Sequence, residues 1–178
     1  MSDEPQSTKA WAVGANGEET LGRRLDGLAS PSVQVLHDRR IPRSRANIDH
    51  IVLCPAGVLV VDAKQYKGRP HLRVEGGLFA PRTEKLMVGS RDGNKLVDGV
   101  LKQVDLVRAA INEESVEVRG YLCFVAADWP LFGGSFATRG VTALWPKRLA
   151  GVVAAPGPLT EDAIQRLHSR LAKTFPVA

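Results

Sequence analysis

An aspartate and a lysine stand one residue apart at the end of a strongly apolar segment of the sequence. Because side chains alternate along a strand, Asp62 and Lys64 point to the same face. The apolar segment 48–54 precedes them across the short connection 55–57, which contains a glycine and predicts a hairpin. Such a hairpin brings Asp49 within about one pairing step of Asp62 and Lys64.

The chemistry available to this trio is that of a site for a hard cation. Two neighbouring carboxylates repel each other, and both stay ionised only if a cation lies between them. Mg²⁺ and Mn²⁺ bind through carboxylates together with water and substrate phosphate. A lysine beside them can orient or deprotonate the attacking water, or offset charge in the transition state. The set fits metal-assisted hydrolysis of a phosphodiester, with Glu18 as a third carboxylate if its helix packs beside the hairpin.

The elements that position this trio follow from the spacing of apolar residues. Helical spacing predicts helices from Ala15 to Pro31, over residues 95–113 and from Thr160 onward. Residues 128–140, rich in glycine and aromatic residues, are expected to form an irregular loop. Strands are predicted at residues 33–37, 48–54, 58–62, 71–74, 78–80, 118–125 and 141–145. This order predicts an α/β or α+β sandwich in which a mixed sheet lies between helices.

Length and composition favour a single globular domain. The chain has 178 residues, of which 44% are hydrophobic, and domains usually contain ~100–200 residues. Residues 1–12 are expected to form a disordered tail before a single domain at 13–178. No apolar run approaches the ~20 residues that span a bilayer, and the first residues do not resemble a secretory signal. We therefore expect a soluble, cytoplasmic protein without a membrane partner.

Positive charge gathers just before the proposed site. The net charge is +5, and the loop 39–45 contains the arginines Arg39, Arg40, Arg43 and Arg45. In one interpretation these arginines, with Lys67 extending the surface, hold phosphates without reading sequence. In the other they belong to a solvated loop, and the sequence does not decide between the two.

Three motifs occur in order along the first part of the chain. They are Gly14-Ala-Asn-Gly-Glu18, Asn47-Ile-Asp49-His50 and Gly57-Val-Leu-Val-Val-Asp62-Ala-Lys64, with Gly68 soon after. Weaker matches lie at Gln103 and at residues 119–124. Together they resemble the nuclease-related domain (NERD) family of the PD-(D/E)xK, restriction-endonuclease-like nucleases. The resemblance implies an α/β three-layer sandwich with a central mixed β-sheet flanked by helices, dependence on Mg²⁺ with Mn²⁺ as a substitute, and cleavage of DNA.

The resemblance also assigns roles to individual residues. It implies that Asp49 and Asp62 bind the metal, with Glu18 as a third acid, and that Lys64 is the catalytic lysine. Gln103 would contact the metal-bound water or the substrate. The third motif usually reads Glu-x-Lys in this family, and here it reads Asp-Ala-Lys.

These observations predict a metal-dependent nuclease that hydrolyses phosphodiester bonds in DNA. RNA as substrate and a homodimeric state stay open. One alternative is a catalytically weak or inactive module on the same fold that binds nucleic acid or another partner. A second is a phosphohydrolase that uses the same acids on a small nucleotide.

Overall fold

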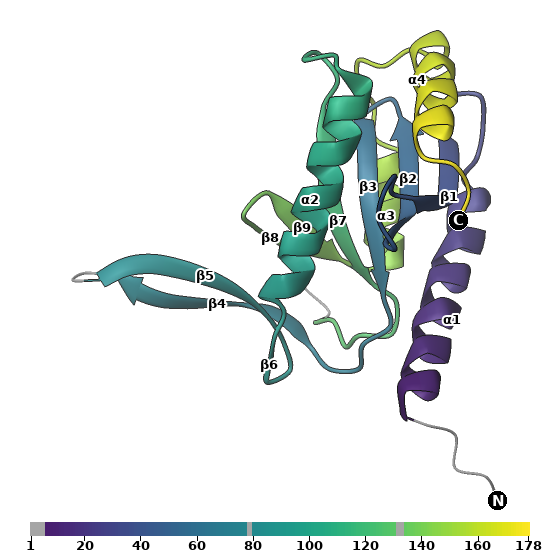
Figure 1. Cartoon of the computed structure of the whole chain (residues 1–178). Helices are drawn as coiled ribbons and strands as arrows, with labels where there is room; N and C mark the ends of the chain where they lie inside the picture. Colours follow the sequence, from purple (N-terminus) through teal and green to yellow (C-terminus); the bar gives the residue numbers. More distant parts are fainter. Residues whose placement is uncertain (1–5, 78–79, 131–133) are drawn as a thin grey trace, which may run out of the picture.

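Runs of strands are separated by helices along the chain: β1 to β6 follow α1, β7 to β9 follow α2, and α3 and α4 come last (Figure 1). The computed structural model describes residues 6–77, 80–130 and 134–178. In chain order the elements are α1 (Gln6–Asp26), β1 (Gln34–Arg40), β2 (Asn47–Cys54), β3 (Gly57–Lys64), β4 (Pro70–Gly77), β5 (Ala80–Val88), β6 (Arg91–Asp92), α2 (Asn94–Ile111), β7 (Val118–Phe124), β8 (Phe136–Thr138), β9 (Val141–Leu144), α3 (Pro146–Val153) and α4 (Glu161–Thr174). No helix in these ranges is long and apolar enough to cross a membrane.

The central sheet has six strands in the order β1-β2-β3-β7-β9-β8 and is mixed. Strands β1, β2 and β3 are antiparallel neighbours, whereas β3, β7 and β9 run parallel to one another. The predicted hairpin is confirmed, because Cys54 pairs with Gly57 across the turn between β2 and β3. Gly57 has φ +134°, and a Cβ there would lie 2.6 Å from the carbonyl oxygen of Glu117, so this turn requires glycine.

Helices cover both faces of the sheet and make three layers. Residues of α2 and α4 pack on one face with Val58, Val60, Leu122 and Phe124 of the central strands. Residues of α1 and α3 pack on the other face with the alternate residues of the same strands. Strand β3 is therefore apolar on both sides, as is usual for a central strand. The α/β three-layer sandwich with a mixed central sheet is confirmed.

A second sheet of three strands, β4-β5-β6, forms an arm that projects away from the sandwich (Figure 1). The strands predicted at residues 71–74 and 78–80 fall in a hairpin, but its strands are longer, Pro70–Gly77 and Ala80–Val88, so the expected connection 75–77 belongs to β4. Residues 78–79 of the predicted second strand lie outside the described residues. The base of the arm lies beside the first turn of α2, where the backbone N–H of Leu86 donates to the side chain of Asn94 at 3.2 Å.

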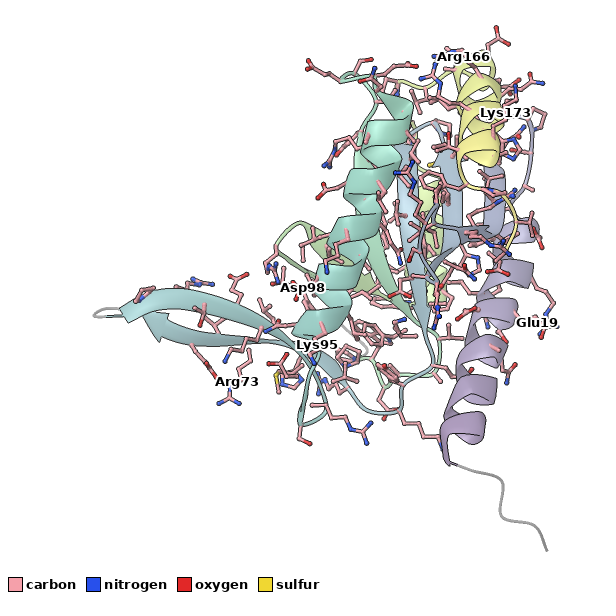
Figure 2. All side chains as sticks on the ribbon, viewed as in Figure 1. Glu19, Arg73, Lys95, Asp98, Arg166 and Lys173 are labelled. Carbon is pink, nitrogen blue, oxygen red and sulfur yellow. The ribbon has the colours of Figure 1, made fainter. Side chains whose placement is uncertain are left out.

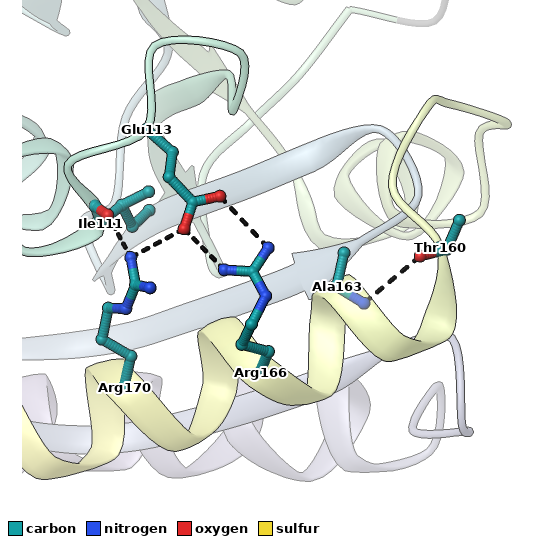
Figure 3. A network of polar contacts seen from close by, with 6 residues as sticks. All are labelled: Ile111, Glu113, Thr160, Ala163, Arg166 and Arg170. Atoms are coloured by element: carbon teal, nitrogen blue, oxygen red, sulfur yellow. Dashed lines mark hydrogen bonds and ion pairs between the residues drawn. The ribbon is translucent and has the colours of Figure 1, made fainter.

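The last helix is tied to the end of α2 by a small ionic network (Figure 3). Arg166 of α4 donates to both carboxylate oxygens of Glu113, at 2.6 and 3.2 Å. Arg170 donates to the same carboxylate at 2.8 Å and to the carbonyl of Ile111. Thr160 caps the start of α4, as predicted, by accepting from the backbone N–H of Ala163.

Several boundaries differ from the sequence-based expectations. Helix α1 begins at Gln6, within the tail predicted for residues 1–12, because residues 6–12 contain good helix formers and neither proline nor glycine. Residues 1–5 lie outside the described residues. Strand β8 lies within the predicted irregular loop 128–140, of which residues 131–133 are not described. Helix α3 was not predicted, since its eight residues give too short a periodic pattern.

Candidate active site

The two aspartates lie at the point where β2 and β3 stop pairing. The last cross-strand pair of this ladder is His50 with Val61, so Asp49 and Asp62 come next on their strands. Instead of a further backbone bond, the backbone N–H of Ala63 donates to Oδ2 of Asp49 at 2.9 Å. The Asp49 side chain thus takes the place of the missing backbone acceptor and is held beside Asp62.

Asp62 and Lys64 form an ion pair at the end of β3. Nζ of Lys64 donates to Oδ1 of Asp62 at 2.6 Å. Asp62 is 7% exposed, and the side chain of Lys64 keeps 22% of its surface accessible. Both residues follow the alternation of Val58 and Val60, so they face the α2 side of the sheet. The sequence-based expectation that the trio would come together is met in the geometry.

Electrostatics at this point disfavour an uncompensated pair of negative charges. Burial, together with the adjacent Asp62 carboxylate, raises the pKa of Asp49 to about 9. Burial also raises the pKa of Glu18, although Lys64 acts in the opposite direction. Burial disfavours the charged form of Lys64, but Asp62 and Asp49 more than offset this and its pKa is raised. Ionisation of both aspartates is therefore disfavoured when no cation is bound, and a bound cation would relieve this.

Glu18 lies on α1, which passes close to the end of β3. A Cβ on Gly17 would lie 2.9 Å from Cβ of Gln65, so the helix approaches the residue after Lys64 very closely. Glu18 and Asp49 both line a cavity of about 340 Å³ between α1 and the strands β1 and β2. Within the described residues, no three His, Cys, Asp or Glu side chains are grouped closely enough to hold a metal. Asp49 and Asp62 form a two-carboxylate set, and metal binding by these two residues and by Glu18 stays a prediction.

Gln103 projects from α2 toward the start of β2. Its Nε2 donates to the carbonyl oxygen of Asn47 at 3.4 Å, two residues before Asp49. Within the described part of the chain, its Oε1 is buried without a hydrogen-bond partner. Gln103 thus lies on the same side of the sheet as the trio and steadies the strand that carries Asp49. A contact with water or substrate stays a prediction.

The predicted arginine surface is divided between two environments. Arg39 is half-buried in β1, opposite Ile48 of β2, whereas Arg40, Arg43 and Arg45 are exposed. The loop that contains the last two leads directly into β2, two residues before Asp49. The three exposed arginines are therefore available to a ligand at this end of the sheet. Contact with nucleic acid stays a prediction for all four, and for Lys67, which is also exposed.

The buried histidine of the second motif faces α1 and lines the same cavity as Glu18 and Asp49. Nδ1 of His50 lies 2.9 Å from Nδ1 of His37, whose Nε2 is 2.9 Å from a carboxylate oxygen of Asp26. Burial and the neighbouring His37 lower the pKa of His50 to about 3. His50 therefore stays neutral and has a packing role, as its position on the strand predicts.

A second cavity lies on the α2 side of the sheet, at the base of the arm. It has a volume of about 290 Å³ and includes Tyr66, Lys67, Arg91 and Lys95 in its lining. Sequence reasoning gave Tyr66, Arg91 and Lys95 no role. The available signal was Tyr66-Lys67, which follows the Asp-x-Lys motif after one residue, whereas the arm that brings Arg91 close was not evident from the sequence.

Comparison with known protein families agrees with this geometry. A model of the family described as nuclease-related domain matches residues 13–125, which is more than half of the chain and includes every residue proposed for the catalytic site. The chain therefore belongs to the nuclease-related domain family, as the three motifs indicated. A search of curated proteins and a search of solved structures each returned no match.

Proposed function

We propose that this protein is a metal-dependent nuclease that hydrolyses phosphodiester bonds in DNA. The observation that carries the proposal is the contact of two aspartates and one lysine at the end of β3. Asp49 is fixed by the Ala63 N–H, and Asp62 is bonded to Lys64 at 2.6 Å. Membership of the nuclease-related domain family supports the same class of reaction.

The residues at this site fit a hard divalent cation such as Mg²⁺ or Mn²⁺. Their donor atoms are carboxylate oxygens, which these ions prefer, and two carboxylates leave room for water and a phosphate oxygen. Burial and Asp62 raise the pKa of Asp49, and a bound cation would favour the ionised form of this carboxyl group. Asp49 and Asp62 would hold the ion, with Glu18 as a third acid. The ion, when bound, would polarise the phosphate and acidify a water molecule.

The chain itself supplies positioning and positive charge. Lys64 is a cation that donates hydrogen bonds, so it can orient the attacking water or offset charge that develops on the phosphate oxygens. The Ala63 N–H and Gln103 fix the strand that carries Asp49. Arg40, Arg43 and Arg45 are exposed near this end of the sheet and would hold phosphates on either side of the cleaved bond without reading sequence.

The test is cleavage of supercoiled plasmid and of fluorescent oligonucleotides with Mg²⁺, with Mn²⁺ and with EDTA. We expect cleavage only with metal, and a loss of at least about 100-fold in Asp62→Asn and Lys64→Met. Asp105→Asn on α2 and Lys173→Met on α4 are matched controls, since both residues are exposed and lie on other elements. Lys173 is labelled in Figure 2. Equal cleavage by the wild type and by the two site variants would overturn the mechanism.

Two other outcomes would assign a different function. Salt-sensitive DNA binding that needs no metal and leads to no cleavage would favour the binding module. Hydrolysis of free nucleotides without cleavage of any polymer would favour the small-nucleotide phosphohydrolase.

A further inference from the structure

The cavity at the base of the arm is formed by three separate parts of the chain. Tyr66 and Lys67 follow β3, Arg91 belongs to β6, and Lys95 and Leu96 belong to the first turn of α2. Figure 2 shows Lys95 at the end of α2 that meets the arm. The volume of about 290 Å³ is close to the lower end of the range for small-molecule sites, which begins near ~300 Å³.

Positive charge in this cavity exceeds negative charge. Lys67, Arg91 and Lys95 face a single acid, Asp92, whose carboxylate accepts from the backbone N–H of Asn94 at 2.7 Å. Throughout the described ranges, none of these three cations forms an ion pair. The cavity is thus suited to an anion.

The cations further out on the arm differ in this respect, because the arm neutralises them itself. Arg73 and Lys85 both bond to Glu75, at 3.0 and 2.8 Å. Arg82 bonds to Glu84 at 3.3 Å. The uncompensated cations of this region are therefore concentrated at the base of the arm and not along it.

An aromatic ring forms one wall of the cavity. Tyr66 is 42% exposed, and its ring centroid lies 6.4 Å from that of the buried Phe124, with the planes tilted by 47°. Phe124 therefore supports one side of the ring while the rest stays accessible. Val88 and Leu96 add apolar surface to the same lining. A ligand with a flat apolar part and a negatively charged part matches this combination, and a nucleotide has both.

The cavity lies on the same side of the sheet as Lys64 of the candidate active site. Phe124 is the cross-strand partner of Lys64 in the β3–β7 ladder, and it packs in the core on the α2 side. Tyr66 is two residues after Lys64, so their Cα atoms are at most about 7 Å apart. A nucleic-acid strand whose phosphate lies at Lys64 would therefore pass the mouth of this cavity.

We propose that the cavity binds one unpaired nucleotide next to the cleaved phosphate, so that the enzyme acts on single-stranded DNA. Tyr66 stacks on the base, and Lys67, Arg91 and Lys95 hold the adjoining phosphate. A paired base cannot enter, because its faces are covered by its neighbours in the duplex, and stacking on a protein ring requires an extruded or single-stranded base. The position of this cavity relative to the cleaved bond rests on the proposed nuclease function. Binding of the nucleotide in the cavity can be measured without cleavage.

The first experiment measures binding in EDTA, which prevents metal-dependent cleavage. Fluorescence anisotropy compares a labelled 12-nucleotide single strand with a duplex of the same sequence. We expect tighter binding of the single strand, a loss of about tenfold in Tyr66→Ala and retention in Tyr66→Phe, which keeps the ring. The double variant Arg91→Met and Lys95→Met should reduce the slope of log K against log salt concentration by up to about 0.7, since each neutralised phosphate contributes about 0.7 and these cations hold one phosphate. Lys173→Met is the control, and circular dichroism checks folding.

The second experiment measures cleavage with Mg²⁺ on the same two substrates. We expect the wild type to prefer the single strand and Tyr66→Ala to lose that preference. Wild-type affinity and strand preference in Tyr66→Ala would overturn the inference while leaving the nuclease function intact. Loss of single-strand binding in Tyr66→Ala, with no cleavage by the wild type under any metal, would support the binding site and overturn the nuclease function.

Discussion

The backbone N–H of Ala63 donates to the side chain of Asp49 at 2.9 Å, although the two strands have stopped pairing one residue earlier. The carboxylate therefore has two roles. It completes the hydrogen bonding of a central strand, and it stands beside Asp62 at the candidate active site. The two roles require different properties, because the first needs an acceptor oxygen and the second needs a negative charge.

Substitutions at Asp49 can separate these two roles. Asp49→Asn keeps an oxygen for the Ala63 N–H and is uncharged at every pH, so it avoids the cost of protonating the buried carboxyl group, whose pKa burial and Asp62 raise to about 9. We expect it to unfold in urea at the same concentration as the wild type or higher at pH 7, and to lose cleavage. Asp49→Ala leaves the N–H of the buried Ala63 without its acceptor, which costs about 1–3 kcal/mol of unfolding free energy. Equal destabilisation by Asn and by Ala would contradict this account.

Binding of Mg²⁺ should stabilise the folded protein independently of any reaction. A ligand present at 100 times its dissociation constant adds about 2.7 kcal/mol, which corresponds to a rise of roughly 5–10 °C in Tm for a domain of this size. Asp62→Asn should lose most of this rise, whereas Asp105→Asn should keep it. Differential scanning fluorimetry with and without EDTA measures both. The same rise in Asp62→Asn as in the wild type would show that the ion binds elsewhere.

The sequence was sufficient to predict the hairpin and the trio on it. Apolar residues fill β2 and β3, Gly57 allows the turn, and a period of 2 fixes which side chains share a face. These are local properties of a continuous segment. The relation of Asp49 to Asp62 follows from them.

Other features depend on contacts between distant segments and were not evident from the sequence. The cavity at the base of the arm combines Tyr66 with Arg91 and Lys95, which meet because the arm returns to α2. Strand β8 forms because Arg139 and Gly140 both adopt positive φ and turn the chain back onto β9, and an arginine in that conformation is not a usual turn signal. Tertiary pairing decides such elements more than local propensity does.

The packing of α2 on the sheet can be tested at two glycines. A Cβ on Gly120 of β7 would lie 2.6 Å from Cγ1 of Val100 and 3.0 Å from Cγ2 of Val104. Both valines are buried and stiff, so Gly120→Ala should displace α2 and destabilise the protein by about 1–3 kcal/mol. Urea unfolding measures the change.

Gly99 provides the matched control on the helix itself. A Cβ there meets no atom within 4 Å, and alanine in a helix is better than glycine by about 0.5–1 kcal/mol. Gly99→Ala should therefore stabilise the protein. Since α2 also carries Gln103, Gly120→Ala should reduce cleavage as well, whereas Gly99→Ala should not. Destabilisation of similar size by both substitutions would contradict the close packing assigned to Gly120.

The network at Glu113 should make part of the stability dependent on pH. Hydrogen bonds and attraction from Arg166, with a further contribution from Arg170, hold the pKa of Glu113 below its ordinary value (Figure 3). An acid whose pKa is lowered on folding contributes stability above its unfolded pKa of about 4.3, and this contribution is lost as the pH falls through the lower, folded value. Glu113→Gln should therefore lower the urea midpoint at pH 7 and have progressively less effect from about pH 4 downward. The neighbouring exposed Glu114→Gln should have no effect at either pH, and a Glu113→Gln deficit that stays constant from pH 7 to pH 3 would rule out the ionic origin.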